Sequence, residues 1–549
     1  MKIVTKILQI TGKYGWGAIL LFLTVFVVGF TWSSSEDLYS SIRLFDKAAL
    51  TISSSYVENI DEAKMVKAGI DGMMDKLDPY SKFLTGADFL YLLQETDGQF
   101  DGIGVSLDYH HDTLTVESVL EGTPSYYKGL KAGDRIISID GKTTFSKNIH
   151  EVKMMLQGLR GTWVNLKIYR PGEGSFAIDI ERRKVEVKAI PYYGMVSNGI
   201  GYIRLSRFSQ GCSDEMRNAL RTLLKQKMSS LIFDLRDNPG GLVNEAVEIA
   251  GMFLQSGSNI VETRSRNGEV GTIYLSQKEP IFIIGSLAIL VNSQTASAAE
   301  IVAGAIQDHD RGVIIGEATF GKGLVQQVMQ FTDDSALKLT TSKYYLPSGR
   351  CLQKPDWSTN ELVAGQIPES ADSLFKTDSG RPVFSAAGII PDIYVDEDSL
   401  SPYVDAIRRG SYFFDFSLNF LKNHPVKYDF KVDDSIMQDF SKFLQSNNFH
   451  FQNDAQAAFA AFKDNLHQTD DEMKQAIATI DRKMASKSNW EFDSHRSEIA
   501  RQLQEAIILQ GLGEKALYSN VWIPKQPQIA KAVNILTDGN RYGQILAVH

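Results

Sequence analysis

The spacing of apolar residues changes along the chain, and each change marks a new kind of segment. From Ile42 to about Leu93 apolar residues return every three or four positions, which predicts helices, and Asp78-Pro79 interrupts them. From Phe100 to about Arg182 apolar and polar residues alternate, as in Leu114-Thr115-Val116, which predicts half-buried strands. Short apolar runs then alternate with helical stretches up to about 400, which predicts an α/β layer.

Beyond Pro402 the pattern is helical again. Residues 411–420 are rich in aromatic side chains, and residues 455–517 have amphipathic helical spacing with charged faces. We expect a helical extension that buries its own apolar stripe. The sequence pattern assigns no role to this extension, and both oligomerisation and substrate capture stay open.

Near the N-terminus, residues 14–32 carry no charge and are long enough to span a bilayer. Lys2, Lys6 and Lys13 precede this stretch and are expected to hold the N-terminus in the cytoplasm. A cleaved signal peptide is the alternative, but Ser33-Ser34-Ser35 is a poor cleavage site. We therefore expect an uncleaved membrane anchor, with the rest of the chain outside the cytoplasm.

The composition narrows the classes of partner and chemistry. The 549 residues carry a formal net charge of −9, which argues against a nucleic-acid partner. Cys212 and Cys351 are the only cysteines, and neither has neighbours at metal-ligand spacing. Two buried thiols and a single disulfide are both open, and we expect neither a metal nor a cofactor.

Candidate chemistry gathers between residues 234 and 327. Ser297 follows an apolar run that predicts a strand and precedes a helical pattern, so backbone N–H groups and the positive end of the helix dipole should face the serine. Ser297-Ala298-Ala299-Glu300 also fits a helix capping box, which is the simpler interpretation of the serine. Lys322 lies between two glycines, and a lone lysine is more often a solvated surface charge.

Several short motifs in order favour the chemical interpretation. Thr295 to Ile301, Phe320 to Gln326 and Asn238-Pro239-Gly240-Gly241 resemble the C-terminal processing (tail-specific) peptidase family, serine proteases that use a Ser-Lys pair. Leu346-Pro347-Ser348-Gly349-Arg350 and Gly388-Ile389-Ile390-Pro391-Asp392 are also similar to family signatures. The resemblance spans roughly residues 55 to 395.

The resemblance implies a role for each matching residue. Ser297 would be the nucleophile, Lys322 the general base and Gln326 the residue that orients the lysine. The backbone N–H groups of Gly240 and Ala298 would form the oxyanion hole. The implied fold of this part is a protease core of the crotonase type.

Elementary chemistry sets a condition on Lys322. A lysine with a pKa of about 10.4 would cost roughly 4.6 kcal/mol to deprotonate at pH 7, and burial can lower a lysine pKa by up to about 3–5 units. The Gln326 amide oxygen can accept a hydrogen bond from the amine without adding a charge that would raise the pKa again. A Ser-His-Asp triad is the competitor. We interpret Asp308 and His309 as supports instead, because no Gly-x-Ser-x-Gly elbow surrounds Ser297.

The segment with alternating periodicity resembles a PDZ domain. Residues 129–136, GLKAGDRI, followed by Asp140-Gly141, carry this resemblance. Such domains take up a peptide C-terminus as an added strand and hold its carboxylate on backbone N–H groups. Gly102, Ile103, Gly104 and Val105 are the expected cradle.

We therefore predict a multidomain α/β (α+β) chain in which a PDZ domain is inserted before the protease core. The predicted parts are 1–35, cytoplasmic stub and transmembrane anchor; 36–95, N-terminal helical region; 96–185, PDZ domain; 186–400, Ser-Lys protease core; and 401–549, C-terminal helical extension. The predicted function is a membrane-anchored, periplasm-facing endopeptidase whose partners are proteins with free apolar C-termini. The alternative is a PDZ adaptor on a degenerate protease fold, which binds tails and cuts nothing; a homo-oligomer or an adaptor partner is also open.

Overall fold

The computed structural model describes residues 38–86, 88–89, 92–93, 99–354, 374–385, 388–396, 399–466, 470–485 and 488–547. The chain divides into two compact units, Met1–Phe83 and Leu84–His549. In the first unit residues 38–55 are helical, and helix α2 (Glu62–Met74) begins after Asp61, whose carboxylate accepts a hydrogen bond from the Lys64 N–H. Strand β1 (Lys82–Thr85) spans the boundary between the units.

The predicted membrane span, residues 14–32, lies outside the described residues. Among the helices that are described, none has both the length and the apolarity to cross a bilayer. The span and its orientation stay predictions.

A six-stranded sheet forms the centre of the second unit. Its order is β10-β11-β12-β15-β16-β21, with β10 antiparallel to β11 and the other neighbours parallel. The strands are β10 (Tyr192–Ser197), β11 (Ile200–Arg204), β12 (Ser230–Asp234), β15 (Ser286–Val291), β16 (Val313–Gly316) and β21 (Ile393–Tyr394). The alternation of strands and helices predicted from the sequence is confirmed here, and the crotonase type of the core stays a prediction.

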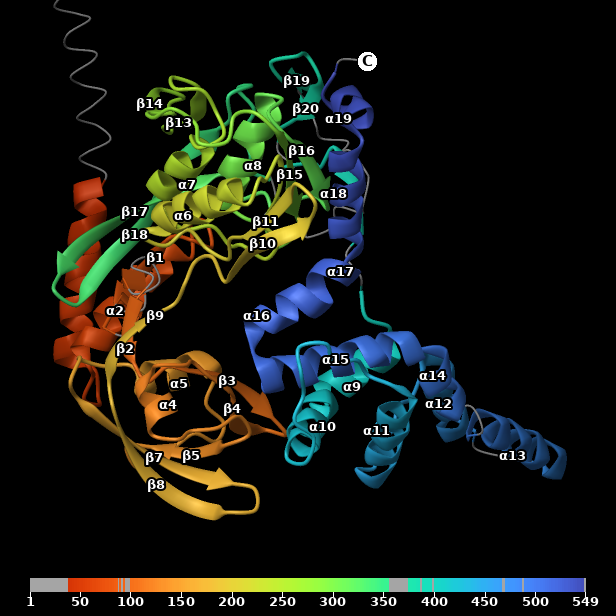
Figure 1. Ribbon diagram of the computed structural model, residues 1–549. Coiled ribbons are helices and arrows are strands. Elements are labelled where there is room, and N and C mark those ends of the chain that lie inside the picture. The colour runs from red at the N-terminus through yellow and green to blue at the C-terminus, as the bar shows by residue number, and fades with distance from the viewer. Residues whose placement is uncertain are drawn as a thin grey trace, which may run out of the picture. The chain divides into compact units, whose positions relative to one another are not determined.

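Helices cover both faces of this sheet (Figure 1). On one face lie α6 (Cys212–Lys225), α7 (Val243–Ala250) and α8 (Ala298–Asp308), which pack against Leu231 and Phe233. On the other face α18 (Pro527–Thr537) packs against Ile232, because successive strand side chains point to opposite faces. Helix α19 (Gly539–Leu546) adds Ile545 and Leu546 to the same cluster. The end of the C-terminal extension thus completes the core of the protease sheet.

A second sheet carries the segment that follows Lys322. Strand β18 (Ser335–Tyr345) pairs with β17 (Leu324–Thr332) and with β13 (Asn259–Arg264), and β13 pairs with β14 (Val270–Leu275). The register of β17 shifts between Val325 and Gln326. A short hairpin of β19 (Leu374–Lys376) and β20 (Pro382–Phe384) lies further along the chain.

The predicted PDZ segment forms its own sheet and core. The sheet order is β3-β4-β5-β7-β8, so β3 is an edge strand, and β6 pairs with β5. The elements are β3 (Val105–His110), β4 (Thr113–Val119), α4 (Pro124–Tyr127), β5 (Arg135–Ile139), β6 (Lys142–Thr143), α5 (Ile149–Leu156), β7 (Trp163–Arg170) and β8 (Gly174–Glu181). Strands β2 (Gln99–Gly102) and β9 (Arg183–Glu186) pair where the chain enters and leaves this segment.

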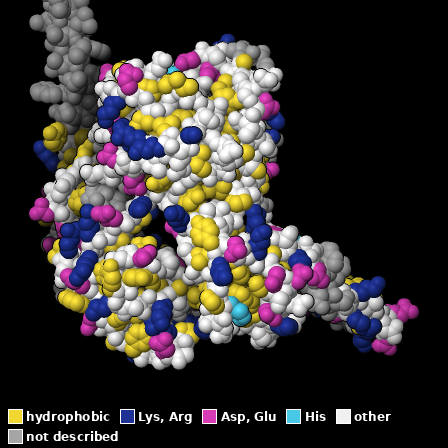
Figure 2. All heavy atoms as spheres, viewed as in Figure 1, with side chains coloured by type: hydrophobic (Ala, Val, Ile, Leu, Met, Phe, Trp, Pro, Cys, Tyr) yellow, Lys and Arg dark blue, Asp and Glu magenta, His cyan; other side chains and the backbone are white. Residues whose placement is uncertain are grey.

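The rest of the C-terminal extension is helical, as predicted. Its helices are α9 (Pro402–Arg409), α10 (Tyr412–Leu421), α11 (Asp434–Ser446), α12 (Asp454–Asp464), α13 (Asp471–Ala485), α14 (Ser488–Ser494), α15 (Arg496–Leu512), α16 (Glu514–Leu517), a π-helix (Tyr518–Trp522) and α17 (Ile523–Lys525). Phe413, Phe416 and Phe440 centre an aromatic cluster of their own between α10, α11 and α15. Helix α13 carries charged side chains of both signs over its visible surface (Figure 2).

Candidate active site

Ser297 lies at the junction between strand β15 and helix α8. Its backbone has φ 56° and ψ −117°, a conformation that residues with a side chain rarely adopt. Strain of this kind costs about 1–3 kcal/mol and persists only where the surroundings fix it. Such backbone strain is concentrated at functional sites, which makes the junction a candidate for catalysis rather than a simple helix cap.

Gly240 packs directly against Ser297. Gly240 has φ +97°, and a Cβ placed on it would lie 2.8 Å from the Ser297 Cβ and 2.9 Å from the Ala298 nitrogen. Only glycine allows this approach, so the predicted oxyanion-hole residues Gly240 and Ala298 do meet at the serine. The Gly240 N–H donates to the Asn238 side-chain oxygen at 2.9 Å. The Gly240 N–H would have to give up this hydrogen bond before it could donate to an oxyanion.

The Glu300 carboxylate connects the serine to the lysine loop. One oxygen, Oε2, accepts the backbone N–H of Ser297 at 2.7 Å and that of Lys322 at 2.9 Å. The other oxygen, Oε1, accepts the Gly321 N–H at 2.8 Å and the Thr319 hydroxyl at 2.5 Å. Glu300 is fully buried. Two segments that are distant in sequence are thus held by the two oxygens of one side chain.

Burial has opposite effects on the two titratable groups at this loop. It raises the pKa of Glu300, and the four hydrogen-bond donors act against that rise. Lys354 lies against Gly321, where a Cβ would be 2.6 Å from the Lys354 Cγ. Burial lowers the pKa of Lys354, and the Glu300 charge acts to raise it. The surroundings of the loop therefore disfavour charge of either sign.

Lys322 and Gln326 flank the start of strand β17. The Lys322 side chain is half-buried, and the Gln326 amide nitrogen is 3.3 Å from the Thr340 hydroxyl on β18. The irregular register at Val325 and Gln326 supplies the bend that a contact between positions 322 and 326 of a strand would need. The orienting role of Gln326 stays a prediction.

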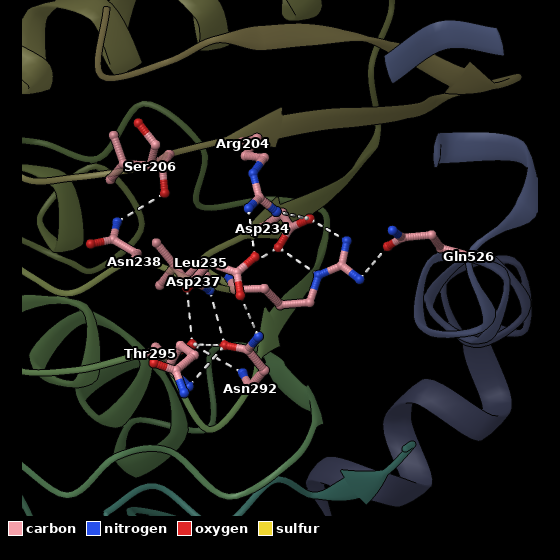
Figure 3. Close-up of polar contacts among 12 residues, drawn as sticks. Arg204, Ser206, Asp234, Leu235, Asp237, Asn238, Asn292, Thr295 and Gln526 are labelled. Atoms are coloured by element: carbon pink, nitrogen blue, oxygen red, sulfur yellow. Dashed lines mark hydrogen bonds and ion pairs between the residues drawn. The ribbon is translucent and has the colours of Figure 1, made fainter. Parts of the chain in front are cut away.

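The turn that carries Gly240 rests on a buried ion network (Figure 3). Asp234, at the end of β12, accepts the Tyr202 hydroxyl at 2.7 Å and the Arg236 Nε at 2.9 Å, and Arg204 lies 3.3 Å away. Burial opposes ionisation of Asp234, but the two arginines outweigh burial and lower its pKa. The network fixes the first residues of the segment Asp234 to Gly241.

The far C-terminal segment reaches the same turn. The Arg236 guanidinium donates to the side-chain oxygens of Gln526 and of Gln528, the latter at 2.9 Å, and Figure 3 shows Gln526 approaching from the junction between α17 and α18. Gln528 is 2% exposed and its amide donates to the Val395 carbonyl at 3.1 Å. The extension therefore touches the support of the candidate site, a contact that the sequence did not predict.

Asp308 and His309 have partners that fit a supporting role. Asp308 forms a 2.7 Å ion pair with the buried Arg350 and accepts the Ser348 N–H at 3.0 Å. The two ring nitrogens of His309 lie 2.7 Å from the Asp378 carboxylate and 2.7 Å from the Asn259 carbonyl. These contacts engage His309 away from Ser297 and do not favour the competing Ser-His-Asp triad.

The predicted PDZ cradle has a mixed environment. Gly104 has φ +83° and lies against Thr123, and its carbonyl accepts the Leu120 N–H at 3.1 Å. The Ile103 side chain is 2% exposed and belongs to the PDZ core, whereas Val105 is only partly buried. Ile103 could wall an apolar pocket only if that core opened, because the core already surrounds its side chain.

The two cysteines, Cys212 and Cys351, are free thiols, which leaves the disulfide alternative without support.

Comparison with protein families matches the chain in four consecutive parts. The models matched are the Activating protease CtpB N-terminal domain over residues 31–86, the PDZ domain over 115–170, Peptidase family S41 over 199–360, and the C-terminal helical domain of a probable PDZ-protease over 403–536. Together with the site, these matches define a serine peptidase that carries a PDZ domain.

Known relatives narrow the class further. The chain is 32% identical over 360 residues to a carboxy-terminal-processing protease of Bartonella bacilliformis, covering 63% of this chain and 80% of that protein. It is also 32% identical over 377 residues to the carboxy-terminal processing protease CtpA of Bacillus subtilis, covering 67% and 79%. The chain belongs to the carboxy-terminal processing protease family.

Among solved structures, the photosystem II D1 C-terminal processing protease is 26% identical, with 64% of this chain and 92% of that chain covered and a TM-score of 0.38.

Glu300 is the functional residue whose contacts the sequence interpretation missed. The capping-box pattern predicted its hydrogen bond to the Ser297 N–H, and that bond is present. The pattern contained no sign of Thr319, Gly321 or Lys322, because these donors come from a loop about 20 residues further along. The sequence did contain one signal of a buried role for Glu300, which is its position as the only carboxylate in the first turn of an otherwise apolar helix face.

Proposed function

We propose that this carboxy-terminal processing protease cleaves peptide bonds with Ser297 as nucleophile and Lys322 as general base. The observation that carries the proposal is the Glu300 carboxylate, which holds the Ser297 and Lys322 backbones on one oxygen. The close approach of Gly240 to the serine supports the assignment of Gly240 and Ala298 as oxyanion donors. A crotonase-type core is part of the same proposal.

The proposed reaction has two halves. The neutral Lys322 amine takes the proton from the Ser297 hydroxyl as the serine oxygen attacks the scissile carbonyl carbon. The resulting oxyanion accepts hydrogen bonds from the Ala298 N–H and from the Gly240 N–H, which first leaves the Asn238 oxygen. The leaving amine takes the proton from Lys322 as the C–N bond breaks. Water then attacks the acyl carbon and gives a proton to Lys322, and Lys322 passes that proton to the Ser297 oxygen as the ester bond breaks. Gln326 would orient the lysine through its amide oxygen.

Two substitutions test the pair. Ser297→Ala should abolish cleavage of an unfolded protein substrate, and the loss of an N-cap hydroxyl should cost only about 0.5–2 kcal/mol of stability. Lys322→Arg should also be inactive because arginine does not lose its proton at accessible pH, whereas Lys343→Arg, at an exposed position on β18, should retain activity. Cleavage at the wild-type rate by either of the first two variants would overturn the assignment.

We also propose that the PDZ domain selects substrates by a free C-terminal carboxylate and an apolar last residue. The edge position of β3 beside α5 supports this, since an added strand needs an unpaired edge. The names of the relatives do not favour the alternative of a silent adaptor, because each is called a protease.

Tail recognition can be measured on the full-length Ser297→Ala chain, which would bind without cutting. A labelled peptide with an apolar end should bind at least about tenfold more tightly as the free acid than as the C-terminal amide, because charge-assisted hydrogen bonds are about twice as strong as neutral ones. Equal affinities of acid and amide would show that capture does not depend on the carboxylate.

Localisation is the last part of the proposal. The uncharged stretch 14–32 and the three lysines before it support a single-pass anchor in the bacterial inner membrane with the catalytic part outside the cytoplasm. A reporter that is active only outside the cytoplasm, fused near residue 60, should be active. Activity of a cytoplasm-only reporter at that position, or recovery of the full-length chain free of membranes, would contradict the anchor.

A further inference from the structure

The β3–β4 hairpin of the PDZ domain carries a cluster of metal-ligating side chains that the proteolytic mechanism does not use. Asp108, His110 and Glu117 each offer one ligand atom, and these atoms all lie within 4.8 Å of one another. The His110 Nε2 is 3.8 Å from the Glu117 Oε1.

The strand geometry explains why the three side chains converge. Asp108 and His110 are two positions apart on β3 and so share a face of the sheet. The pairing of β3 with β4 joins Ser106 to Ser118 and the next residue of β3 to Val116, which leaves Glu117 as an extra residue in a β-bulge. A bulge redirects a side chain, and here it brings the Glu117 carboxylate to the same group.

His110 supplies a second, independent observation. His110 is only 9% exposed, and neither its Nδ1 nor its Nε2 has a hydrogen-bond partner among the described residues. The ring of Phe414, on α10, stacks on the imidazole with centroids 4.3 Å apart and planes 16° apart. Stacking covers the face of the ring and leaves the in-plane nitrogens directed past it. A buried imidazole with both nitrogens unbonded is costly unless something binds them.

We propose that Asp108, His110 and Glu117 bind a divalent transition-metal ion, for which Zn²⁺ is the probe. One imidazole nitrogen and two carboxylate oxygens suit Zn²⁺, and a water molecule would complete four-coordination. Ligands about 2.1 Å from a tetrahedral ion lie roughly 3.4 Å apart, so the 3.8 Å between His110 and Glu117 needs only a small adjustment. Asp108 is exposed, which gives the ion a path from solvent.

The position of the site connects it to the peptide-docking strand. His110 is the last residue of β3, whose first residue, Val105, belongs to the predicted carboxylate cradle. A metal ion on His110 and Glu117 would fix the end of β3 to the bulge in β4. Helix α10 covers His110 and also places Asp415 2.8 Å from His111, so metal binding should stabilise the contact between the PDZ domain and the C-terminal extension.

Calorimetric titration of the full-length, detergent-solubilised chain with ZnCl₂ tests the proposal. The protein should carry no histidine tag, and bound metal should first be removed with EDTA. We expect one ion per chain for the wild type and for His450→Ala, which removes an exposed imidazole elsewhere. His110→Ala and Glu117→Gln should each weaken binding at least about tenfold, since even residues behind the ligands tune metal affinity by 10–100-fold.

Two further measurements make the outcome decisive. Excess Ca²⁺ or Mg²⁺ should not displace Zn²⁺, because these ions prefer all-oxygen sites, and Co²⁺ should give visible absorption that is lost in Glu117→Gln. Glu117→Gln keeps the shape of the side chain, so this variant still tests Zn²⁺ binding if His110→Ala does not fold. Equal Zn²⁺ affinity in the wild type and in Glu117→Gln, or no binding at about 1 mM Zn²⁺, would overturn the proposal.

Discussion

Substitution of Glu300 by glutamine is the most direct test of how the site is held together. Each Glu300 oxygen accepts two hydrogen bonds, so an amide NH₂ in place of either oxygen faces two donors. Two hydrogen bonds to a charged group are lost, at about 1.5–3 kcal/mol each. A buried neutral amide is less costly than a buried carboxylate, so we expect a net loss of about 2–4 kcal/mol of unfolding free energy.

The effect on catalysis should exceed what the loss of stability explains. With two of the donors released, the Ser297 or Lys322 backbone can shift, and a misplacement of about 1 Å can cost about 100-fold in rate. We expect a fall in kcat of that order with little change in KM, measured on a peptide substrate at a temperature where the variant is folded.

Glu215→Gln is the matched control. Glu215 also accepts two backbone N–H groups, from Ala189 at 3.2 Å and Ile190 at 3.1 Å, but these lie on a different part of the core. The control should lose about 1–2 kcal/mol of stability and keep its kcat. If Glu300→Gln kept a kcat within about twofold of the control, the positioning argument would be refuted.

The pH dependence of Glu300 separates positioning from stability. Burial raises its pKa, so the folded protein binds a proton at a pH where an unfolded glutamate is ionised. As pH falls through this raised pKa, the group's contribution to folding stability improves, because the folded state then binds more protons than the unfolded state. Activity should nevertheless fall, since a protonated oxygen cannot accept both of its donors. In Glu300→Gln the part of the fall in kcat that comes from Glu300 protonation should be absent, and only the fall that comes from protonation of Lys322 should remain.

Three further results are expected. Gln326→Glu should move the limb on which activity rises with pH to higher pH by about 1–3 units, because a carboxylate beside Lys322 favours the charged amine; an unmoved limb would remove Gln326 from the site. Gln528→Ala should cost about 1.5–3 kcal/mol of unfolding free energy, since it removes an acceptor from the Arg236 guanidinium, whereas Gln330→Ala on β17 should be neutral in the same denaturant titration. Burial raises the thiol pKa of Cys212 and of Cys351, so both should react slowly with iodoacetamide at about pH 8 in the folded protein and quickly after unfolding; fast native labelling of Cys212 would contradict its burial.

Local patterns predicted the parts of the fold that depend on local spacing. The strand that ends at Val291 was predicted from a short apolar run, and the helix that begins after Ser297 from a polar turn followed by a helical pattern. The position of the serine at a strand–helix junction follows from the order of that run, the turn and the helical pattern. The motifs then assigned the chemistry, and the fold brought Gly240 to Ser297 as the motifs implied.

Contacts between distant segments could not be predicted in this way. Helix α18 has an apolar stripe, but nothing in the stripe specifies that it packs on Ile232 and Leu290 of the protease sheet. Arg236 and Gln528 are 292 positions apart, and a glutamine carries no sign of its partner. The group of Asp108, His110 and Glu117 was not predicted, because Glu117 joins the other two only through a bulge in the strand register.

The two buried carboxylates beside the candidate site are held in opposite ways, and the difference bears on Lys322. Asp234 is held by arginines, which lower its pKa and keep it ionised as a fixed anchor. Glu300 is held by uncharged donors, three backbone N–H groups and one hydroxyl. An ionised carboxylate close to a lysine normally raises the lysine pKa, which would prevent Lys322 from acting as a base. Four hydrogen bonds spread the Glu300 charge over the backbone of the loop, so the carboxylate can fix the Lys322 backbone while attracting a proton on its amine less strongly.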